Sequence, residues 1–443
     1  MSEGTDLNTA VRTPRASDRD RLRVRRSPAV AVAAIGAVLL AATGLLFSRP
    51  DVIAIGLPLA LYAIVALTMR TSTATISVDA GTGTAAEVLT DVVTIDGDAE
   101  VVQLAIVQGD RIHRTVLVPG RARITSRIPV RHSGPVRAVE LDGRVIGADA
   151  GALGPALPAT GTTRAVPPPA RPLRRLPLPS RLTGVHGAHD GSRPGQGGDF
   201  RDIHPFAPGD ELRRVDWRAT ARAARRPGDL LVRRTDSLSD ASVVIVMDTA
   251  DDLGTAVATW GVRDPERSGV TSLDLAREAA RSIAESTIGA GDRVSFHTLV
   301  HGGRSVRSGS GARHLARVVA EISAAGEGGD DARYRRTPPV PHGSIIYVLS
   351  TFFDGAAAQI AMSWRASGHR VVAVDVLPAL DRARLEPEHA LALRVLLAER
   401  VDMMHELRTA GIDIVAWRQA PSEDLAALTA RSRPGGPGGG GGR

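Results

Sequence analysis

Two long runs of apolar residues near the N-terminus are the strongest pattern in the chain. Residues 29–47 contain no charged side chain, and residues 52–69 form a second uncharged run of similar length. A helix needs about 20 apolar residues to cross the hydrocarbon core of a membrane. Only residues 48–51 separate the two runs, which suits a tight reversal of the chain. The pattern therefore predicts a transmembrane hairpin over residues 29–70.

The placement of arginine predicts how this hairpin is oriented. Residues 1–28 hold seven arginines, whereas Arg49 is the one basic residue between the two runs, and Arg70 follows the second. Basic residues concentrate on the cytoplasmic side of membrane spans. We therefore expect a two-pass protein of the cell (inner) membrane, with lipid contacts through the hairpin. Its N-terminal basic segment, residues 1–28, and its C-terminus are both expected in the cytoplasm.

Beyond the hairpin the apolar runs become short. Between residues 74 and 147 they are separated by turn signals such as Asp96-Gly97-Asp98, a pattern typical of a small antiparallel β-sandwich. Residues 148–180 are rich in Pro, Ala and Gly, which is typical of a semi-extended linker. Residues 433–443 are almost entirely Gly and Pro and are expected to be disordered.

Residues 240–432 alternate between continuous apolar stretches and helical patterns. The first stretch, residues 241–247, is followed by a helical pattern at about residues 272–288, and four further pairs of this kind follow. Strands that are apolar on both faces and alternate with helices predict a parallel sheet covered on both sides. We therefore expect a doubly wound α/β domain here, as the last domain of a multi-domain chain.

Composition excludes several classes of chemistry. The chain has no cysteine, which removes thiol nucleophiles, disulfides and cysteine-ligated zinc. All 55 basic residues are arginine, so the lysine of a Walker-type phosphate loop is absent and the chain is not itself a P-loop ATPase. Aromatic residues make up only 3% of the chain, and the net charge of +7 is modest for 443 residues. Neither property favours nucleic-acid binding.

The first strand of the predicted α/β domain ends in oxygen-bearing residues. In open α/β sheets, ligands bind at this carboxyl edge. The spacing of Asp248 and Asp252 resembles the D-x-S-x-S loop of von Willebrand factor type A domains, in which an aspartate and two hydroxyls hold a divalent cation. Here Ala250 and Asp252 stand at the two serine positions, and Thr271 can supply a further hydroxyl. Since the number of oxygen ligands decides Mg²⁺ binding, we expect a degenerate site of Asp248, Asp252 and Thr271 that binds Mg²⁺ weakly at most, with Asp248 instead accepting hydrogen bonds from loop amides.

Residues 181–234 carry the most specific pattern in the chain. Eleven arginines are interleaved there with seven acidic residues, and guanidinium–carboxylate pairs of this kind hold irregular backbone in place. The run resembles the signature of the bacterial domain of unknown function 58 family. The residues that carry the resemblance are Gly195-Gln196-Gly197, Phe200-Arg201-Asp202-Ile203, Pro208-Gly209-Asp210, Arg213-Arg214, Val215-Asp216-Trp217 and Ala221-Arg222.

This resemblance implies a partner rather than a reaction. Proteins of the family are usually encoded beside MoxR-type AAA+ ATPases and are thought to act with them in the assembly or maturation of other proteins. The resemblance implies no catalytic residue and no cofactor. We therefore expect a membrane-anchored, non-enzymatic adaptor that docks a MoxR-type ATPase. The candidate docking residues are Phe200, Arg201, Asp202, Asp210, Arg213, Arg214, Asp216, Trp217 and Arg222.

Three other interpretations stay open. The signature segment can be a clamp packed against the α/β domain instead of a docking surface. The carboxyl edge of the same domain can belong to a hydrolase of unrecognised type. With the opposite membrane orientation, the α/β domain would be a metal-dependent adhesion module outside the cell.

Overall fold

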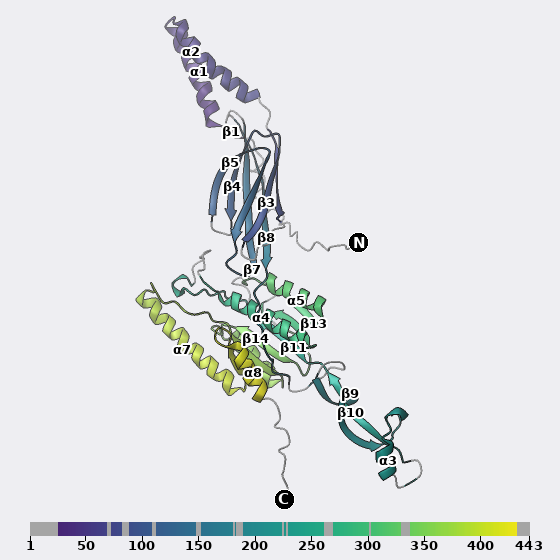
Figure 1. The fold of residues 1–443 in the computed structure, drawn as a ribbon. Coiled ribbons are helices and arrows are strands. Elements are labelled where there is room, and N and C mark those ends of the chain that lie inside the picture. The colour runs from purple at the N-terminus through teal and green to yellow at the C-terminus, as the bar shows by residue number, and fades with distance from the viewer. Residues whose placement is uncertain are drawn as a thin grey trace. The chain divides into compact units, whose positions relative to one another are not determined.

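The computed structural model divides the chain into two units (Figure 1). The first comprises the chain up to residue 131 together with residues 136–164, and the second comprises residues 132–135 and the chain from residue 165 onward. The residues that the structure describes are 25–68, 72–81, 88–108, 112–147, 152–179, 182, 189–223, 226, 229–260, 269–300, 303–328 and 337–431. Most of the predicted basic segment and all of the predicted disordered tail lie outside these residues.

The first unit begins with two apolar helices, α1 (Pro28–Leu46) and α2 (Pro50–Thr68). They pack antiparallel, since Val30 near the start of α1 contacts the cluster that contains Ala63 near the end of α2. A Cβ atom at Gly44 would lie 2.5 Å from Cγ1 of Ile53, so this glycine allows the helices to approach closely. Large apolar side chains cover the outer surface of the pair. By length and composition both helices can cross a membrane, and the pair is compatible with the predicted anchor.

The rest of the first unit consists of antiparallel strands in two sheets. One sheet has the order β2-β3-β6 and the other has the order β1-β8-β7-β4-β5. Buried and exposed positions alternate along β3 and the first part of β4, as expected for strands that cover a core with one face. The bounds of these strands are β1 (Arg25–Arg26), β2 (Ala74–Ala80), β3 (Val88–Gly97), β4 (Val101–Gln108), β5 (Ile112–Pro119), β6 (Ala122–Pro129), β7 (Gly134–Ile146) and β8 (Ala152–Val166).

Strand β8 corrects the prediction of a linker over residues 148–180. The whole of this strand lies within the predicted linker, because the segment is rich in Ala, Gly and Pro, yet the strand pairs within the larger sheet. It also reaches the other sheet: Thr162 Oγ1 and Arg164 Nη1 donate to the carboxylate of Asp91 on β3, at 2.8 and 3.0 Å. Neighbouring strands supply the pairing here, and strand preference depends strongly on such context.

The second unit is built around a six-stranded sheet with the order β13-β12-β11-β14-β15-β16. All neighbouring pairs are parallel except β12 with β13. The parallel sheet was predicted, whereas the short antiparallel edge strand β13 was not. The strand bounds are β11 (Ser242–Met247), β12 (Arg293–Thr298), β13 (Ser305–Gly309), β14 (Ile345–Ser350), β15 (Arg370–Asp375) and β16 (Asp413–Ala416).

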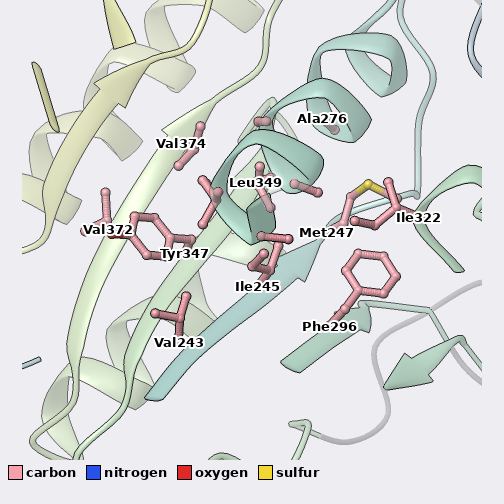
Figure 2. Packing of buried hydrophobic residues seen from close by; sticks show 14 of the residues in the cluster. Val243, Ile245, Met247, Ala276, Phe296, Ile322, Tyr347, Leu349, Val372 and Val374 are labelled. Atoms are coloured by element: carbon pink, nitrogen blue, oxygen red, sulfur yellow. The ribbon is translucent and has the colours of Figure 1, made fainter. Parts of the chain in front are cut away.

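Helices cover both faces of this sheet, which confirms the doubly wound arrangement. On one face Ile245 of β11 packs in a cluster with Ala276 of α4 and Ile322 of α5 (Figure 2). On the other face Val246 packs in a second cluster with Trp364 of α6 and neighbours from α7. The helix bounds are η2 (Val257–Thr259), α4 (Ser272–Gly289), α5 (Ala312–Ala324), α6 (Ala356–Ala366), α7 (Pro387–Thr409) and α8 (Pro421–Arg431). Helix α7 begins well before the predicted start at about residue 401.

The predicted signature segment forms a two-stranded hairpin with a helical end, which we call the arm (residues 189–239). Its elements are β9 (His189–Pro205), η1 (Leu212–Arg214), α3 (Trp217–Ala223) and β10 (Leu231–Ser239). At the base of the arm, His189 Nε2 lies 2.9 Å from Asp292 Oδ2, and the N–H of Ala241 donates to Asp292 Oδ1. The arm therefore joins the α/β sheet where β11 and β12 begin.

The contribution of the Asp91–Arg164 ion pair to the junction between the two β-sheets can be tested by substitution. Replacing Asp91 with Ala leaves the partly buried Arg164 without its carboxylate, and breaking a buried pair in this way costs about 3–5 kcal/mol. The opening free energy of β3 amides, measured by hydrogen exchange, is expected to fall by this amount. Asp96→Ala on the same strand is the matched control: its 3.5 Å pair with Arg121 is highly exposed, so it should cost less than about 1 kcal/mol. Equal effects of the two substitutions would contradict the proposed junction.

Candidate functional site

The carboxyl edge of the parallel sheet gathers residues from strands that are distant in sequence. The strand order changes direction at β11, with β12 on one side and β14 on the other, and such a switch point is where open α/β sheets bind ligands. Asp248 follows β11, and Ser350 ends β14. The Ser350 hydroxyl donates to Asp248 Oδ2 at 2.6 Å, so these two strand ends are joined directly.

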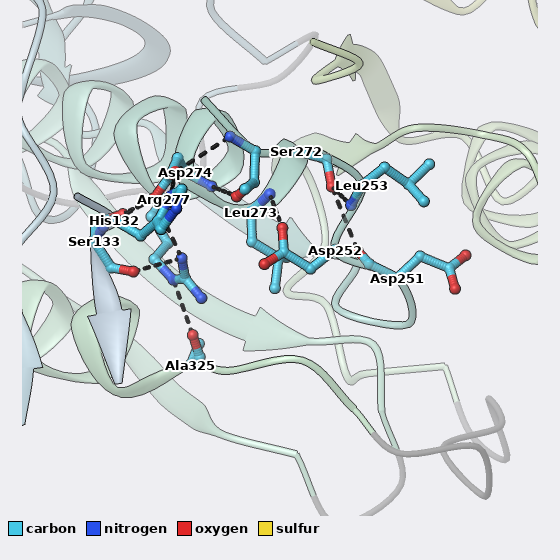
Figure 3. Close-up of polar contacts among 11 residues, drawn as sticks. His132, Ser133, Asp251, Asp252, Leu253, Ser272, Leu273, Asp274, Arg277 and Ala325 are labelled. Carbon is cyan, nitrogen blue, oxygen red and sulfur yellow. Dashed lines mark hydrogen bonds and ion pairs between the residues drawn. The ribbon is translucent and has the colours of Figure 1, made fainter. Parts of the chain in front are cut away.

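Each of the three predicted metal ligands accepts a hydrogen bond from the protein. Asp248 Oδ1 accepts from the N–H of Ala250 at 3.1 Å. Asp252 Oδ1 accepts from the N–H of Leu273 in the first turn of α4 (Figure 3). Thr271 is the N-cap of α4 and accepts from the N–H of Asp274, which is a capping box. Asp252 and Thr271 thus stabilise the start of one helix.

This set of side chains does not fit a type A metal site. Ala250 brings no side-chain oxygen to the loop, and both carboxylate oxygens of Asp248 accept hydrogen bonds. Within the part of the chain that the structure describes, no group of three or more His, Asp or Glu side chains is arranged to hold a metal. A hard divalent cation takes about six oxygen ligands, and this loop lacks the two serine hydroxyls that a type A loop supplies.

The edge is nevertheless rich in negative charge. Burial raises the pKa of Asp251, and the nearby charges of Asp248, Asp354 and Glu327 raise it further. Figure 3 shows the Asp251 carboxylate pointing away from the start of α4, where the Asp252 carboxylate caps the helix. A carboxylate whose pKa is raised by neighbouring negative charges lies on a surface that favours a cationic group.

An arginine from α7 lies beside this edge. Arg400 Nε donates to the carbonyl of Thr351 at 2.7 Å, and Nη2 lies 2.5 Å from Asp375 Oδ1. The guanidinium also stacks 5.6 Å from the ring centre of Phe353. Arg400 therefore fastens α7 to the ends of β14 and β15. The role of Arg400 is not evident from the sequence, because this residue lies just before the predicted helix and no local pattern links it to strands that end 25 and 50 residues earlier.

A Ser, a His and an Asp meet at the start of α4, but their geometry is not that of a catalytic triad. Asp274 Oδ2 lies 2.7 Å from His132 Nδ1, and Asp274 Oδ1 accepts from the Ser133 hydroxyl at 2.9 Å (Figure 3). A triad needs the hydroxyl beside the imidazole, which acts as its base. Burial alone would raise the pKa of Asp274, but the hydrogen bonds from His132, Ser133 and Thr271 outweigh it and lower the pKa. The ionised carboxylate therefore serves to hold residues 132–133 against α4.

Two of the three acidic docking candidates on the arm, Asp210 and Asp216, are engaged within the arm itself. Asp210 Oδ2 accepts from the N–H of Ala207, and Asp216 Oδ1 accepts from the N–H of Ala219, each at 2.9 Å. Asp216 thereby caps the first turn of α3. Arg213 and Arg214 both pair with Glu211. These residues shape the arm.

The aromatic candidates, in contrast, face solvent. The side chain of Trp217 is 65% exposed and that of Phe200 is 52% exposed. Arg201, Asp202 and Arg222 are exposed as well. A clamp against the α/β domain would bury these rings, so their exposure favours the docking interpretation.

The structure adds three exposed arm residues that sequence analysis did not select. Leu212 is 64% exposed in η1, and Arg218 is exposed on α3. Arg233 of β10 stacks over Phe200, with its guanidinium 5.1 Å from the ring centre. The helical period places Arg218 and Arg222 side by side, because they are four residues apart. This spacing is visible in the sequence and could have indicated that the two arginines share one face.

Comparison with known proteins bears on this part of the chain. Residues 202–386 match the family described as "Protein of unknown function DUF58". The uncharacterized proteins Mb1516 of Mycobacterium bovis and Rv1480 of Mycobacterium tuberculosis are each 29% identical to the chain over 220 residues. The aligned part is 46% of this chain and 63% of each relative, so the chain spans less than two thirds of the length of these curated relatives. No solved structure matches the chain.

The assignment of Asp248 as an acceptor of loop hydrogen bonds can be tested by substitution. Asp248→Ala leaves the Ser350 hydroxyl and the Ala250 N–H without their acceptor, and each such loss costs about 1–3 kcal/mol, so chemical denaturation should show a loss in this range. Asp251→Ala is the matched control and should leave stability unchanged or higher, because it removes a carboxylate that other carboxylates surround. Titration calorimetry with Mg²⁺ should give the same heat for wild type and Asp248→Ala. A clear Mg²⁺ heat that depends on Asp248 would contradict the assignment.

Proposed function

Residues 202–386 form a DUF58 domain, and from this premise we propose that the protein is a membrane-anchored, non-enzymatic adaptor for a MoxR-type AAA+ ATPase. The adaptor would hold the ATPase near the membrane while the ATPase acts in assembly or maturation of other proteins. The choice of ATPase rests on the family resemblance of the signature segment, and the anchor rests on α1 and α2.

The observation that carries this proposal is the exposed arm. Trp217 and Phe200 are held in solvent by an ordered hairpin and helix rather than by a loose loop. Trp side chains are enriched at protein interfaces, and the exposure of Trp217 on an ordered element supports a docking role for the arm. Trp and Arg are also the residue types that contribute most to protein–protein affinity.

We further propose that the α/β unit is of the von Willebrand factor type A kind. Its strand order, its single antiparallel edge strand and the position of Asp248 after the central strand support this assignment. Type A domains are binding modules, which agrees with an adaptor. In this chain the docking surface would be the arm, because the residues of the edge loop hold backbone amides.

A hydrolase that uses the carboxyl edge is the second candidate. The observation in its favour is the raised pKa of Asp251, since a carboxyl group of this kind can donate a proton at higher pH than an ordinary one. Against it, neither the hydroxyl of Ser350 nor that of Ser133 donates to an imidazole; each donates to a carboxylate. The hydrolase hypothesis gives the arm no role, and it therefore ranks below the adaptor hypothesis.

The adaptor proposal predicts direct binding of a MoxR-type ATPase. The full chain, purified in detergent, should co-elute with the ATPase from the same organism in size-exclusion chromatography, with a Kd of about 1 μM or tighter, which corresponds to roughly 8 kcal/mol. The measurement is made without nucleotide, with ADP and with ATP and Mg²⁺, because ATPases change shape with nucleotide. An Asp248→Asn variant serves as the control and should bind equally. Absence of co-elution in every nucleotide state would contradict the proposal.

The proposed topology can be tested with single cysteines, because the natural chain has none. Ser48→Cys places a thiol in the turn between α1 and α2, and Ser367→Cys places one at an exposed position after α6. In intact cells, a maleimide that reaches the outer face of the cell membrane but cannot cross this membrane should label position 48. Position 367 should stay unlabelled until the cells are lysed. Labelling of position 367 in intact cells would mean that the α/β unit lies outside, as in an adhesion module.

A further inference from the structure

Among the described residues of the second unit, the large hydrophobic aromatic side chain with the greatest exposure lies at the end of the arm. Trp217 begins α3, and the helical period brings Ala221 to the same side and Arg218 and Arg222 next to it. All four side chains are exposed. We call these four residues the tip face. A single large ring flanked by two guanidinium groups is thus presented to solvent.

The backbone beneath the tip face is held firmly. The Thr220 hydroxyl accepts from the N–H of Leu231 at 3.0 Å, and the N–H of Asp216 donates to the carbonyl of Leu231 at 2.8 Å. Val215 and Val232 are buried where these segments meet. α3 is therefore tied to β10 on one side, which leaves the tip face free on the other. A surface ordered in advance loses little entropy when it binds.

The charge of the arm is one-sided. Between residues 200 and 234 there are nine arginines and five acidic residues, so the net charge is +4. Asp210 and Asp216 hold backbone amides, and Glu211 pairs with neighbouring arginines. Among the described side chains, no carboxylate lies within ion-pair distance of Arg218 or Arg222. The tip face therefore presents positive charge that the arm itself does not neutralise.

From these observations we propose that the tip face docks onto an acidic protein surface that has an apolar pocket. The pocket receives the Trp217 ring, and carboxylates beside it receive the guanidinium forks of Arg218 and Arg222, which pair with carboxylates in a bidentate manner. This inference rests on the proposed docking function and names the contact surface and the chemistry of the partner.

A protein partner fits the tip face better than an anionic membrane or a nucleic acid. Glu211, which pairs with Arg213 and Arg214, and Asp229 lie at exposed positions close to the tip face in sequence, so a continuous layer of phosphates would bring phosphate groups next to carboxylates. A protein surface can place carboxylates opposite the arginines alone. The experiment therefore has to distinguish binding to a protein from binding to an anionic lipid surface.

Trp217 itself can report binding. Of the four tryptophans in the chain, Trp364 and Trp417 are buried and Trp260 is half-buried, so acrylamide quenches mainly Trp217. The full chain is placed in nanodiscs of neutral lipid and titrated with a synthetic peptide of alternating Glu and Leu. The peptide should protect Trp217 from acrylamide, and protection should weaken as salt is added. The difference from a Trp217→Phe chain isolates this signal.

Matched charge reversals identify the surface. Arg218→Glu with Arg222→Glu should weaken peptide binding at least about tenfold, because both guanidinium partners are lost. The control is Arg313→Glu with Arg317→Glu, an exposed pair with the same spacing on α5, and it should bind within about twofold of wild type, since rim charges away from a contact contribute little. A peptide with Ser in place of Leu should bind more weakly, because it cannot fill a contact with Trp217.

Three results would overturn the inference. They are no protection of Trp217 by the peptide, equal effects of the two charge reversals, and protection that appears only when phosphatidylglycerol is added to the nanodisc. The ATPase provides the separate test: if it binds wild type and Trp217→Ala equally, the tip face is not its docking surface, and the adaptor function stands. If the peptide binds through the tip face and the ATPase binds no form of the chain, the adaptor function fails, and the tip face stands as an acidic-partner site.

Discussion

Burial of strand β11 on both faces is the constraint on which the second unit depends. All six of its residues, from Ser242 to Met247, are buried, and helices from both sides pack on it. A strand without a polar face can exist only between two helical layers. Since the strand cannot shift, the chain on either side of it is fixed too. The arm ends directly before β11, and the acidic edge loop begins directly after it.

Because β11 links them, the arm and the edge loop lie at opposite ends of one sheet. At the amino end, Asp292 holds both His189 and the N–H of Ala241, so the base of the arm is tied to the strands. At the carboxyl end, Ser350 joins Asp248, and Arg400 joins the ends of β14 and β15. Two chemically different surfaces, one basic and aromatic and one acidic, thus stand on a single rigid support.

Arginine and acidic residues have different tasks in this chain. The carboxylates of Asp210, Asp216, Asp252 and Asp274 all accept backbone N–H groups and thereby hold turns and helix starts. Arginines serve partly as internal fasteners, as Arg400 does, and partly as exposed groups on α3. With nearly all its cationic charge permanent, the arm keeps its positive face at any physiological pH. The interleaved sequence of acids and arginines thus leaves the guanidinium groups of Arg218 and Arg222 exposed on α3.

Local periodicity was enough to predict the apolar helix pair and the alternating strands and helices of residues 240–432, because each of these patterns is complete within one segment of chain. Prediction from the sequence was incomplete where the structure of a segment or the role of a residue depends on residues distant in the chain. Residues 152–166 form a strand because neighbours across the sheet pair with them, and Arg400 has a role only because α7 lies across the ends of β14 and β15. Asp252 and Thr271 were considered as ligands of a degenerate metal site from their positions after the first strand, and the structure adds that their oxygens accept hydrogen bonds at the start of α4. The sequence by itself determined which residues are apolar, charged or aromatic, and thus the two kinds of layer. Only the tertiary structure decided which charges are paired inside the protein and which, like those of Arg218 and Arg222 beside Trp217, stay exposed, since that depends on contacts between segments far apart in the chain.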